Sequence, residues 1–470
     1  MNQHSQQPII VWFRRDLRIS DNAALYHATL RARPIIPLFI FDTDIINSLS
    51  SDGAAFNFQA ECLQDLNEGL QRIGGRLFCR KGKALQVHAK LIQEASPSAI
   101  FYNRDYEPHA RDRDRAVEQL YRSHGIEVQS FKDHVVHEPE EVLTLQNRPY
   151  SIFTPYMKAW KSLPVQSPFP TPAKITVAPV ESCGILNAHD LHKQVTIPRP
   201  LCRGGETQAK KVWEQFIRTS LASYSSNRNI PSIKGTSRLS PYIRFGCIAV
   251  RTLYRDLLAL KSIPIEAFLN ELIWREFYQS VMYHFPDVLT ASYKRAFDTL
   301  PWNTDTEFLH RWRSGHTGVP LVDAGMRELN QTGWLHNRVR MVVASFLTKQ
   351  LFIHWKQGEE YFESKLLDIE TASNNGGWQW AASTGVDPKP LRIFNPELQA
   401  QKFDPEGVYI KTYVPELQNV PLQHLFAPHR MSLDEQHRCG CIIGKTYPRP
   451  IVDHRLASEK FKKAYMQLLR

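Results

Sequence analysis

Short apolar runs alternate with segments of helical periodicity over residues 1–135. An apolar run bounded by polar turns predicts a buried strand, and apolar residues three or four positions apart predict a helix. Strands that alternate with helices are typical of an α/β domain with a five-stranded, parallel, Rossmann-like sheet. The predicted strands cover residues 9–13, 35–41, 76–79, 99–102 and 126–131, and the predicted helices cover residues 56–72, 87–92 and 110–124.

The rest of the chain follows a different pattern. Residues 136–205 are rich in proline, which disfavours long helices and predicts a linker between domains. Residues 206–470 carry apolar positions at helical spacing and predict a second, all-α domain. Its predicted helices cover residues 209–223, 249–260, 267–285, 321–330, 338–355, 359–368 and 458–469.

Composition supports a globular protein of two domains. The chain has 470 residues, of which 42% are hydrophobic. It contains no apolar run long enough to cross a membrane, and residues 1–7 lack the apolar segment of a secretory signal. Of its seven cysteines only Cys439 and Cys441 lie close together, and no zinc-site spacing accompanies them. We therefore expect reduced thiols and a cytoplasmic protein.

The net charge of the chain and the residues that follow the first strand indicate which ligands the protein could bind. The net charge of +11 favours a polyanionic partner, with nucleic acid foremost. The first strand leads into Arg14, Arg15 and Asp16 rather than a glycine-rich turn, so the dinucleotide fingerprint is absent. Residues 102–108 are polar and follow the fourth strand, where such sheets bind ligands. A solvated loop without a ligand is the alternative interpretation.

Residues 366–380 hold the densest group of chemically active side chains. Two acids, three amides, two glycines and two tryptophans lie within this segment. Amides donate and accept hydrogen bonds at a ring edge, and glycines let the backbone approach a flat group. The segment therefore suits a planar redox cofactor beside a planar substrate. The alternative is a helix end followed by a glycine turn, with tryptophans in the core.

Three further segments are candidates for binding. Residues 235–241 place hydroxyl groups before a helical stretch, which suits phosphate binding but also ordinary helix capping. Glu271 and Trp274 share a helix face, where they could bind a pyrimidine edge and stack on a base, or belong to an amphipathic helix with an aromatic core. Arg338 and Arg340 offer charge to a phosphate or an acid.

Residues 374–380, Asn-Asn-Gly-Gly-Trp-Gln-Trp, resemble the flavin-site motif of the DNA photolyase/cryptochrome family. The sequence is most similar to the bacterial class I enzymes that repair cyclobutane pyrimidine dimers. The resemblance extends from residues 11–18 to residues 450–454 and so covers nearly the whole chain. It implies an FAD cofactor, UV-damaged DNA as substrate, and light-driven electron transfer from reduced FAD to a flipped-out dimer.

The resemblance also implies roles for individual residues. Asn374 matches the amide near flavin N5, and Arg340 matches the arginine that pairs with Asp368. Glu370 is a departure, because close relatives often have aspartate there. The implied FAD-binding residues are Tyr224, Thr236, Ser237, Arg238, Leu239, Ser240, Phe268, Arg340, Asp368, Ile369, Glu370 and Asn374.

DNA contacts, electron transfer and an antenna chromophore are implied in the same way. Trp302, Trp355 and Trp378 match the tryptophan electron-transfer chain, and Glu271 matches a residue that contacts the dimer. The residues implied to contact DNA or the lesion are Arg228, Glu271, Trp274, Arg275, Tyr278, Asn337, Arg338, Met341, Trp380 and Gln399.

The identity of the antenna stays open. Asp105 and Glu107 resemble residues of the deazaflavin-binding branch. His109 and Ala110 stand where the folate-binding form carries an amide and an acid. Methenyltetrahydrofolate and 8-hydroxy-deazaflavin are therefore both possible.

Two other members of the family are alternatives, namely a signalling cryptochrome and a (6–4) photolyase. Asn374, Trp380 and the lack of a long C-terminal tail argue against the cryptochrome. The (6–4) enzymes have paired histidines where this chain has only His336. A non-photochemical DNA-binding flavoprotein is a more distant alternative. We expect a monomer without an obligate protein partner.

Overall fold

The computed structural model describes residues 7–48, 51–386 and 391–468. Contacts within the chain divide it into two compact units. The first unit comprises Met1–Val195, Cys202–Ala222 and Ser237–Pro286, and the second comprises Thr196–Leu201, Ser223–Thr236 and Asp287–Arg470. The domain limits 1–135, 136–205 and 206–470 remain predictions. No helix in the described part of the chain combines the length and the apolar content that a membrane span requires.

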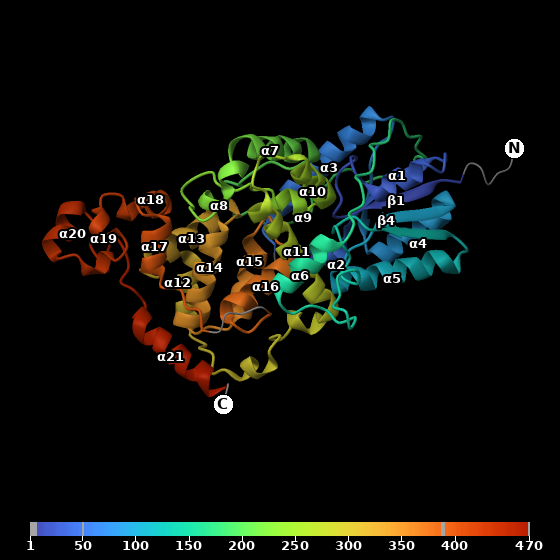
Figure 1. Ribbon diagram of the computed structural model, residues 1–470. Helices are drawn as coiled ribbons and strands as arrows, with labels where there is room; N and C mark the ends of the chain where they lie inside the picture. Colours follow the sequence, from blue (N-terminus) through green and yellow to red (C-terminus); the bar gives the residue numbers. More distant parts are fainter. Residues whose placement is uncertain (1–6, 49–50, 387–390, 469–470) are drawn as a thin grey trace. The chain divides into compact units, whose positions relative to one another are not determined.

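The first unit contains the predicted five-stranded parallel sheet, with strand order β3-β2-β1-β4-β5 (Figure 1). The central strand β1 pairs with β2 through Ile9 and Ile35, and with β4 through Ile9 and Ala99. The predicted third strand, 76–79, is displaced, because pairing with β2 rather than apolarity sets its limits. The strands are β1 (Ile9–Phe13), β2 (Ile35–Asp42), β3 (Phe78–Gly82), β4 (Ala99–Asn103) and β5 (Glu127–Phe131).

Helices cover both faces of this sheet (Figure 1). Alternate strand residues such as Ile10, Trp12 and Leu38 pack against α4 and α5, while α1 contacts β1, β4 and β5. The short helices α1 and α2 were not predicted, and the predicted linker contains α6. The helices of this unit are α1 (Ala23–Thr29), α2 (Thr43–Ser48), α3 (Gly53–Arg72), α4 (Ala84–Ala95), α5 (Pro108–Ser123), α6 (Phe153–Ser162), α7 (Glu206–Thr219), α9 (Ser240–Arg244), α10 (Val250–Ala259) and α11 (Glu266–His284).

A buried cluster of four charges joins helix α10 to the loops of the sheet. Arg251 lies 2.6 Å from Asp21 and 3.5 Å from Asp133, measured between Nη2 and the carboxylate oxygen Oδ1. Arg18 contacts the same Asp133 oxygen at 2.6 Å. All four side chains are almost completely buried. Each charge is costly to bury alone, so the cluster holds only while its partners are complete.

We expect Arg251→Met to lower the free energy of unfolding by about 3 kcal/mol, because it leaves the Asp21 carboxylate buried without its cation. Arg31→Met is the matched control, since the Arg31–Glu127 ion pair is exposed and contributes little. Urea denaturation followed by circular dichroism measures both variants. Equal stability of the two would contradict the importance of the buried cluster.

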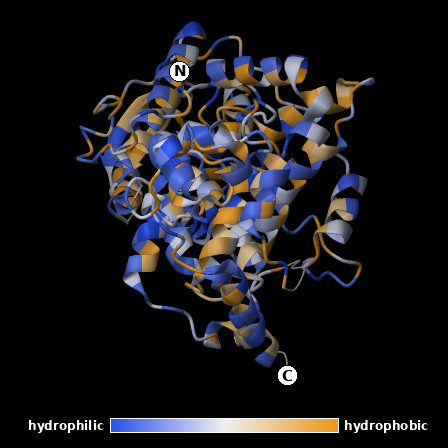
Figure 2. Cartoon of the chain, turned by 90° about the vertical axis from the view of Figure 1, so that its left-hand side faces the viewer, coloured by the Kyte–Doolittle hydropathy of each residue, from blue (hydrophilic) through white to orange (hydrophobic). Residues whose placement is uncertain are grey.

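The second unit is helical, as predicted for the C-terminal part of the chain. Apolar and polar residues are interspersed along its helices (Figure 2), and the apolar ones form a buried cluster. The α-helices are α8 (Tyr224–Asn227), α12 (Thr306–Ser314), α13 (Pro320–Thr332), α14 (Asn337–Ser345), α15 (Trp355–Lys365), α16 (Thr371–Ala382), α17 (Pro396–Phe403), α18 (Val408–Tyr413), α19 (Leu422–Leu425), α20 (Leu433–Cys439) and α21 (His454–Gln467). The short 3-10 turns of the two units are η2 (Leu221–Ser223), η3 (Pro286–Leu289), η4 (Arg295–Thr299), η6 (Pro415–Leu417) and η7 (Pro428–Arg430).

The single helix predicted over residues 338–355 is wrong. Helix α14 ends at Ser345, and one turn of π-helix, η5 (Phe346–Gln350), follows it. Nζ of the buried Lys349 donates to the carbonyl of Arg392, and Nε2 of Gln350 donates to the carbonyl of Phe394. These contacts with a distant segment compensate for the irregular backbone, which apolar periodicity does not reveal.

Candidate functional site

The sequence Asn-Asn-Gly-Gly-Trp-Gln-Trp lies inside helix α16 of the second unit. The alternative of a helix end followed by a glycine turn is therefore wrong. Neither Gly376 nor Gly377 has a positive φ, and the helix ends instead at Ala382, followed by the cap residue Ser383, where φ is 67°. Two adjacent glycines weaken a helix by propensity, so tertiary contacts must hold this one.

Polar side chains fix the buried face of α16. Nδ2 of Asn375 donates to the Glu359 carboxylate and to the Val288 carbonyl, both at 2.9 Å. Gln379, one turn later, donates to the same Val288 carbonyl at 2.9 Å and accepts from the Tyr293 amide. Burial raises the pKa of Glu359, although Lys356 and Asn375 oppose that shift. This set of contacts, the buried amide ladder, sets the rotation of α16 about its axis.

The opposite face of α16 is open within its own unit. Nδ2 of Asn374 donates to the Glu359 carbonyl at 3.1 Å, while its Oδ1 accepts no hydrogen bond from the described residues. A methyl group at Gly377 would meet no atom within 4 Å. Trp380, three residues further on, is half-buried against the core. An amide oxygen, a bare stretch of backbone and an indole therefore share one accessible surface.

The residues that precede α16 carry two acids. Both carboxylate oxygens of Asp368 accept hydrogen bonds from Nη2 of Arg340, at 2.8 and 3.0 Å, as the resemblance implies. Glu370 is buried and accepts a hydrogen bond from the Ser373 hydroxyl. Ile369 between them packs against the core of the second unit. The segment thus presents anchored carboxylates next to the open face.

Trp378, Trp355 and Trp302 belong to the same apolar cluster of the second unit. Trp378 packs against Gly358, which lies one turn after Trp355 in α15. The ring of His354 lies 5.3 Å from Trp355 and 5.1 Å from Trp302, measured between ring centroids. Trp355 and Trp378 are fully buried, and Trp302 is partly exposed. The series runs from the interior of the unit toward its surface.

Helix α14 presents Asn337, Arg338 and Met341 on its accessible side. Arg338 donates to Oδ1 of Asn229 at 2.8 Å, and its guanidinium lies 4.5 Å from the ring centroid of Phe403.

Two more predicted residues lie in this neighbourhood. Burial lowers the pKa of Arg338, and the nearby guanidinium groups of Arg228 and Arg392 lower it further. Gln399 is four residues before Phe403 in α17, so the two share a helix face. Arg228, Arg338 and Gln399 therefore gather on one part of the second unit, which is basic.

Helix α11 of the first unit is buried except for a stripe that includes Glu271, Trp274 and Tyr278. The Trp274 ring stacks on Phe153 with a centroid distance of 3.8 Å and a tilt of 6°, which fixes its plane. Arg275 does not belong to this stripe. It is buried and contacts the ring of His134 at 2.6 Å, so its position does not favour a contact with DNA.

The remaining cofactor residues predicted from the resemblance occupy different environments. Phe268 is buried and contacts Trp213 and Phe216. Tyr224 is buried at the start of α8, with the guanidinium of Arg228 over its ring.

In the predicted phosphate-binding segment, Arg238 has a φ of 53°, a conformation that non-glycine residues seldom adopt. Leu239 is buried, and Thr236, Ser237 and Ser240 are accessible. Arg238 thus marks a constrained turn just before α9.

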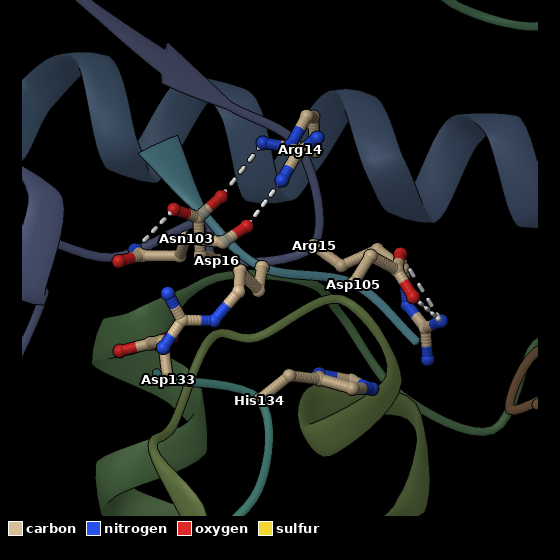
Figure 3. Close-up of a pocket in the computed structure, with 8 residues that line it drawn as sticks. Arg14, Arg15, Asp16, Asn103, Asp105, Asp133 and His134 are labelled. Atoms are coloured by element: carbon tan, nitrogen blue, oxygen red, sulfur yellow. Dashed lines mark hydrogen bonds and ion pairs between the residues drawn. The ribbon is translucent and has the colours of Figure 1, made fainter. Parts of the chain in front are cut away.

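A small polar pocket lies at the carboxyl ends of β1, β4 and β5, in the region that the sequence predicts (Figure 3). Nη1 of Arg15 contacts Asp105 at 3.4 Å and Glu107 at 2.8 Å, so both predicted antenna residues are already paired with a cation. Burial raises the pKa of Asp105, but Arg15, His134, Arg113 and Arg14 together outweigh that effect, so the pKa lies below the usual range. The pocket is lined by Arg14, Arg15, Asp16, Asn103, Arg104, Asp105, Asp133 and His134.

Sequence reasoning missed the residues that support the candidate site. Glu359 binds both asparagines of the motif, Gly358 makes room for Trp378, and Phe153 fixes Trp274. The spacing of Asn375 and Gln379, four residues apart, was the one visible signal of the amide ladder.

An α/β unit joined to a helical unit with an open, amide-bearing helix face is the architecture of a photolyase-type flavoprotein. Residues 9–173 match the family described as DNA photolyase, and residues 268–467 match the family described as FAD binding domain of DNA photolyase. The chain belongs to the DNA photolyase family, and FAD is its cofactor.

Individual relatives are similar over almost their whole length. A deoxyribodipyrimidine photo-lyase from Synechococcus is 37% identical over 98% of this chain and 97% of that protein. A class III photolyase from Agrobacterium tumefaciens is 35% identical with a TM-score of 0.92, covering 99% of this chain and 98% of that one. A Synechocystis cryptochrome is 29% identical with a TM-score of 0.91, covering 99% of this chain and all of that one.

Two glycines test the description of α16. A methyl group at Gly358 would lie 2.1 Å from the Trp378 ring, so we expect Gly358→Ala to lower the free energy of unfolding by about 1–3 kcal/mol. Gly377→Ala is the matched control and should raise it by up to about 1 kcal/mol in the flavin-free protein, because alanine favours helices. Denaturation of the two flavin-free variants measures both effects. Destabilisation by Gly377→Ala would contradict the open face.

Proposed function

We propose that this protein repairs cyclobutane pyrimidine dimers in UV-damaged DNA, using light. The open face of α16, on which Asn374, Gly377 and Trp380 lie together, is the observation that carries this proposal. It offers one surface to a flat cofactor and to a flat lesion. The full-length similarity to proteins named deoxyribodipyrimidine photo-lyase supports the same reaction.

The residues around α16 fit FAD. The Oδ1 atom of Asn374 is available to accept a hydrogen bond from a protonated ring nitrogen, which favours reduced flavin. The absence of a side chain at Gly377 leaves room for a flat ring, and Arg340 holds the Asp368 carboxylate in place. When bound and reduced, FAD would supply light-driven one-electron chemistry to the dimer, with the electron returned once the cyclobutane ring has opened.

Basic and aromatic residues of the second unit would hold the damaged strand. Arg228 and Arg338 provide charge for backbone phosphates, which makes binding depend on salt. Trp380 provides a ring on which the flipped dimer stacks, and Asn337 and Met341 lie on the accessible side of α14. Extruding a damaged pair costs less than extruding an intact one, so the flip itself contributes selectivity.

Glu271 and Trp274 of the first unit would contact the dimer through the accessible stripe of α11. Phe153 prepares the plane of Trp274 for stacking, so little ordering is needed on binding. The Glu271 carboxyl group would hydrogen-bond a pyrimidine edge and stabilise negative charge on the dimer. Tyr278 extends the same stripe.

Trp378, Trp355 and Trp302 would carry electrons that return oxidised flavin to its reduced state. Their common cluster supports this role, as does the partial exposure of Trp302 next to two fully buried members. Tyr224, Phe268 and residues 236–240 are proposed FAD contacts on the basis of the family motif alone. An antenna chromophore, a monomeric state and a cytoplasmic location complete the proposal.

A repair assay with two lesions tests this function directly. Reduced, FAD-loaded protein is illuminated with blue light in the presence of an oligonucleotide that contains either a cyclobutane thymine dimer or a (6–4) photoproduct. We expect intact thymines to be restored from the cyclobutane substrate in the light but not in the dark. Repair of the (6–4) substrate would show that the lesion class is wrong. Flavin photoreduction without any repair would indicate a signalling cryptochrome.

Replacement of Trp380 separates stacking from overall folding. Trp380→Ala should weaken binding of dimer-containing DNA by about 1–3 kcal/mol, roughly tenfold to a hundredfold in Kd, since base–aromatic stacking is lost. Trp380→Phe keeps an aromatic face and should recover much of that affinity. Titration with damaged and undamaged oligonucleotides gives the difference. An equal loss of affinity for both DNAs would argue against contact with the lesion.

A further inference from the structure

His354 occupies a special position in the tryptophan series, because its ring contacts two of the three members. Its centroid lies 5.1 Å from that of Trp302 at an interplanar angle of 73°, and 5.3 Å from that of Trp355 at 30°. The imidazole is half-buried between the partly exposed indole and the fully buried one. Any charge on His354 therefore acts on both indoles at short range.

A constrained turn holds this arrangement. Phe352 is buried and has a φ of 57°, an unusual conformation that persists only where the surroundings enforce it. The carbonyl of Phe352 accepts from the Asn303 amide at 2.6 Å, and the carbonyl of Leu351 accepts from Nδ2 of Asn303. Asn303 directly follows Trp302. The turn therefore fastens Trp302 against the ring of His354.

The hydrogen bonds of His354 favour its neutral form. Nδ1 accepts from the Lys356 amide at 3.1 Å, so the imidazole caps the N-terminus of α15 and carries its proton on Nε2. Burial lowers the pKa of His354 from its ordinary value. Among the nearby charges, Asp298 of η4 and Glu360 of α15 raise this pKa, and Lys356 of α15 lowers it.

We propose that His354 is a positioning residue that keeps an uncharged ring between Trp302 and Trp355 at neutral pH, and that its protonation in acid slows electron transfer through them. This inference rests on the proposed function of the tryptophan series. Trp378 would give one electron to the light-excited, oxidised flavin, and Trp355 would replace it. Trp302 then gives one electron to the oxidised Trp355. An added thiol then gives one electron to oxidised Trp302 and its proton to the solvent, and two of the resulting thiyl radicals couple to form a disulfide.

Electrostatics explain the direction of the effect. A positive imidazolium about 5 Å from each ring destabilises a cation on either indole to a similar extent. The imidazolium therefore raises the free-energy cost mainly of the step that moves positive charge from Trp378 to Trp355. Nε1 of Trp302 is buried and has no hydrogen-bond partner among the described residues.

The first test needs no flavin. The pH dependence of Trp302 fluorescence is measured in flavin-free protein as the difference between wild type and Trp302→Phe. We expect quenching as pH falls, with a midpoint below 6.5, because the imidazolium forms beside the indole. His354→Asn is the matched control, since it retains a capping acceptor but has no ionisable ring. A Trp302 signal with the same pH dependence in that variant would overturn the proposal.

The second test follows light-driven flavin reduction in FAD-loaded protein with an added thiol. The wild-type rate should fall roughly tenfold between pH 7.5 and pH 5, and the rate of His354→Asn should stay nearly constant. Asp298→Asn removes a carboxylate that favours protonation, so it should move the wild-type midpoint to lower pH. Parallel pH profiles for wild type and His354→Asn would overturn the inference.

Chemical reduction distinguishes this inference from the proposed repair function. Dithionite-reduced enzyme does not need the tryptophan series, so wild type and His354→Asn should repair dimers equally at each pH. Failure of repair in both proteins would contradict the proposed function while leaving the photoreduction test intact. Unequal repair after chemical reduction would overturn the assignment of His354 to electron transfer.

Discussion

The buried amide ladder beneath α16 is the constraint on which the candidate site depends. A helix with two adjacent glycines has little intrinsic stability, yet this one must present a defined face. Asn375 and Gln379 solve the problem by sharing the Val288 carbonyl, while Glu359 contacts both asparagines of the motif. Because these bonds are satisfied on the buried side, Asn374 and Trp380 are left for the accessible side. The contacts on the buried face of α16 thus allow its other face to stay accessible.

The two units achieve order by different means. In the first unit, ion pairs hold the loops at the ends of the parallel strands in place. The pairs made by Arg251 and Arg15 are examples. In the second unit, neutral amides and packed indoles do most of this work. One fixed charge nevertheless lies beside the tryptophans, since Nζ of Lys356 is 5.8 Å from the Trp355 ring centroid and pairs with the Glu359 carboxylate.

The sequence predicted the sheet well because buried parallel strands appear as continuous apolar runs, and β1 began and ended at the predicted residues. It failed where tertiary contacts override local preference. Helix α16 was not predicted, because the glycines and amides that weaken it locally are stabilised by residues such as Glu359 and Val288, far away in sequence. The break after Ser345 was missed for a similar reason.

The candidate site was predicted unevenly. The Arg340–Asp368 pair followed from family resemblance and is present. Arg275 illustrates the limit of that approach, since a residue next to Trp274 on a helix points to another face, here toward His134. Gly358 could not be identified, because its importance lies in the indole that fills the space beside it. The roles of the site residues in binding stay predictions.

The π-helix at Phe346–Gln350 makes this part of the chain intolerant of changes in length. A π-turn holds one residue more than an α-turn, and each residue of a helix advances the chain by about 100°. Loss of a single residue here would restore regular winding, but it would rotate every following position out of phase with the core. Trp355 would then leave its place, and Lys349 and Gln350 would turn away from Arg392 and Phe394. Among homologues, insertions and deletions should therefore accumulate in surface loops and avoid this turn.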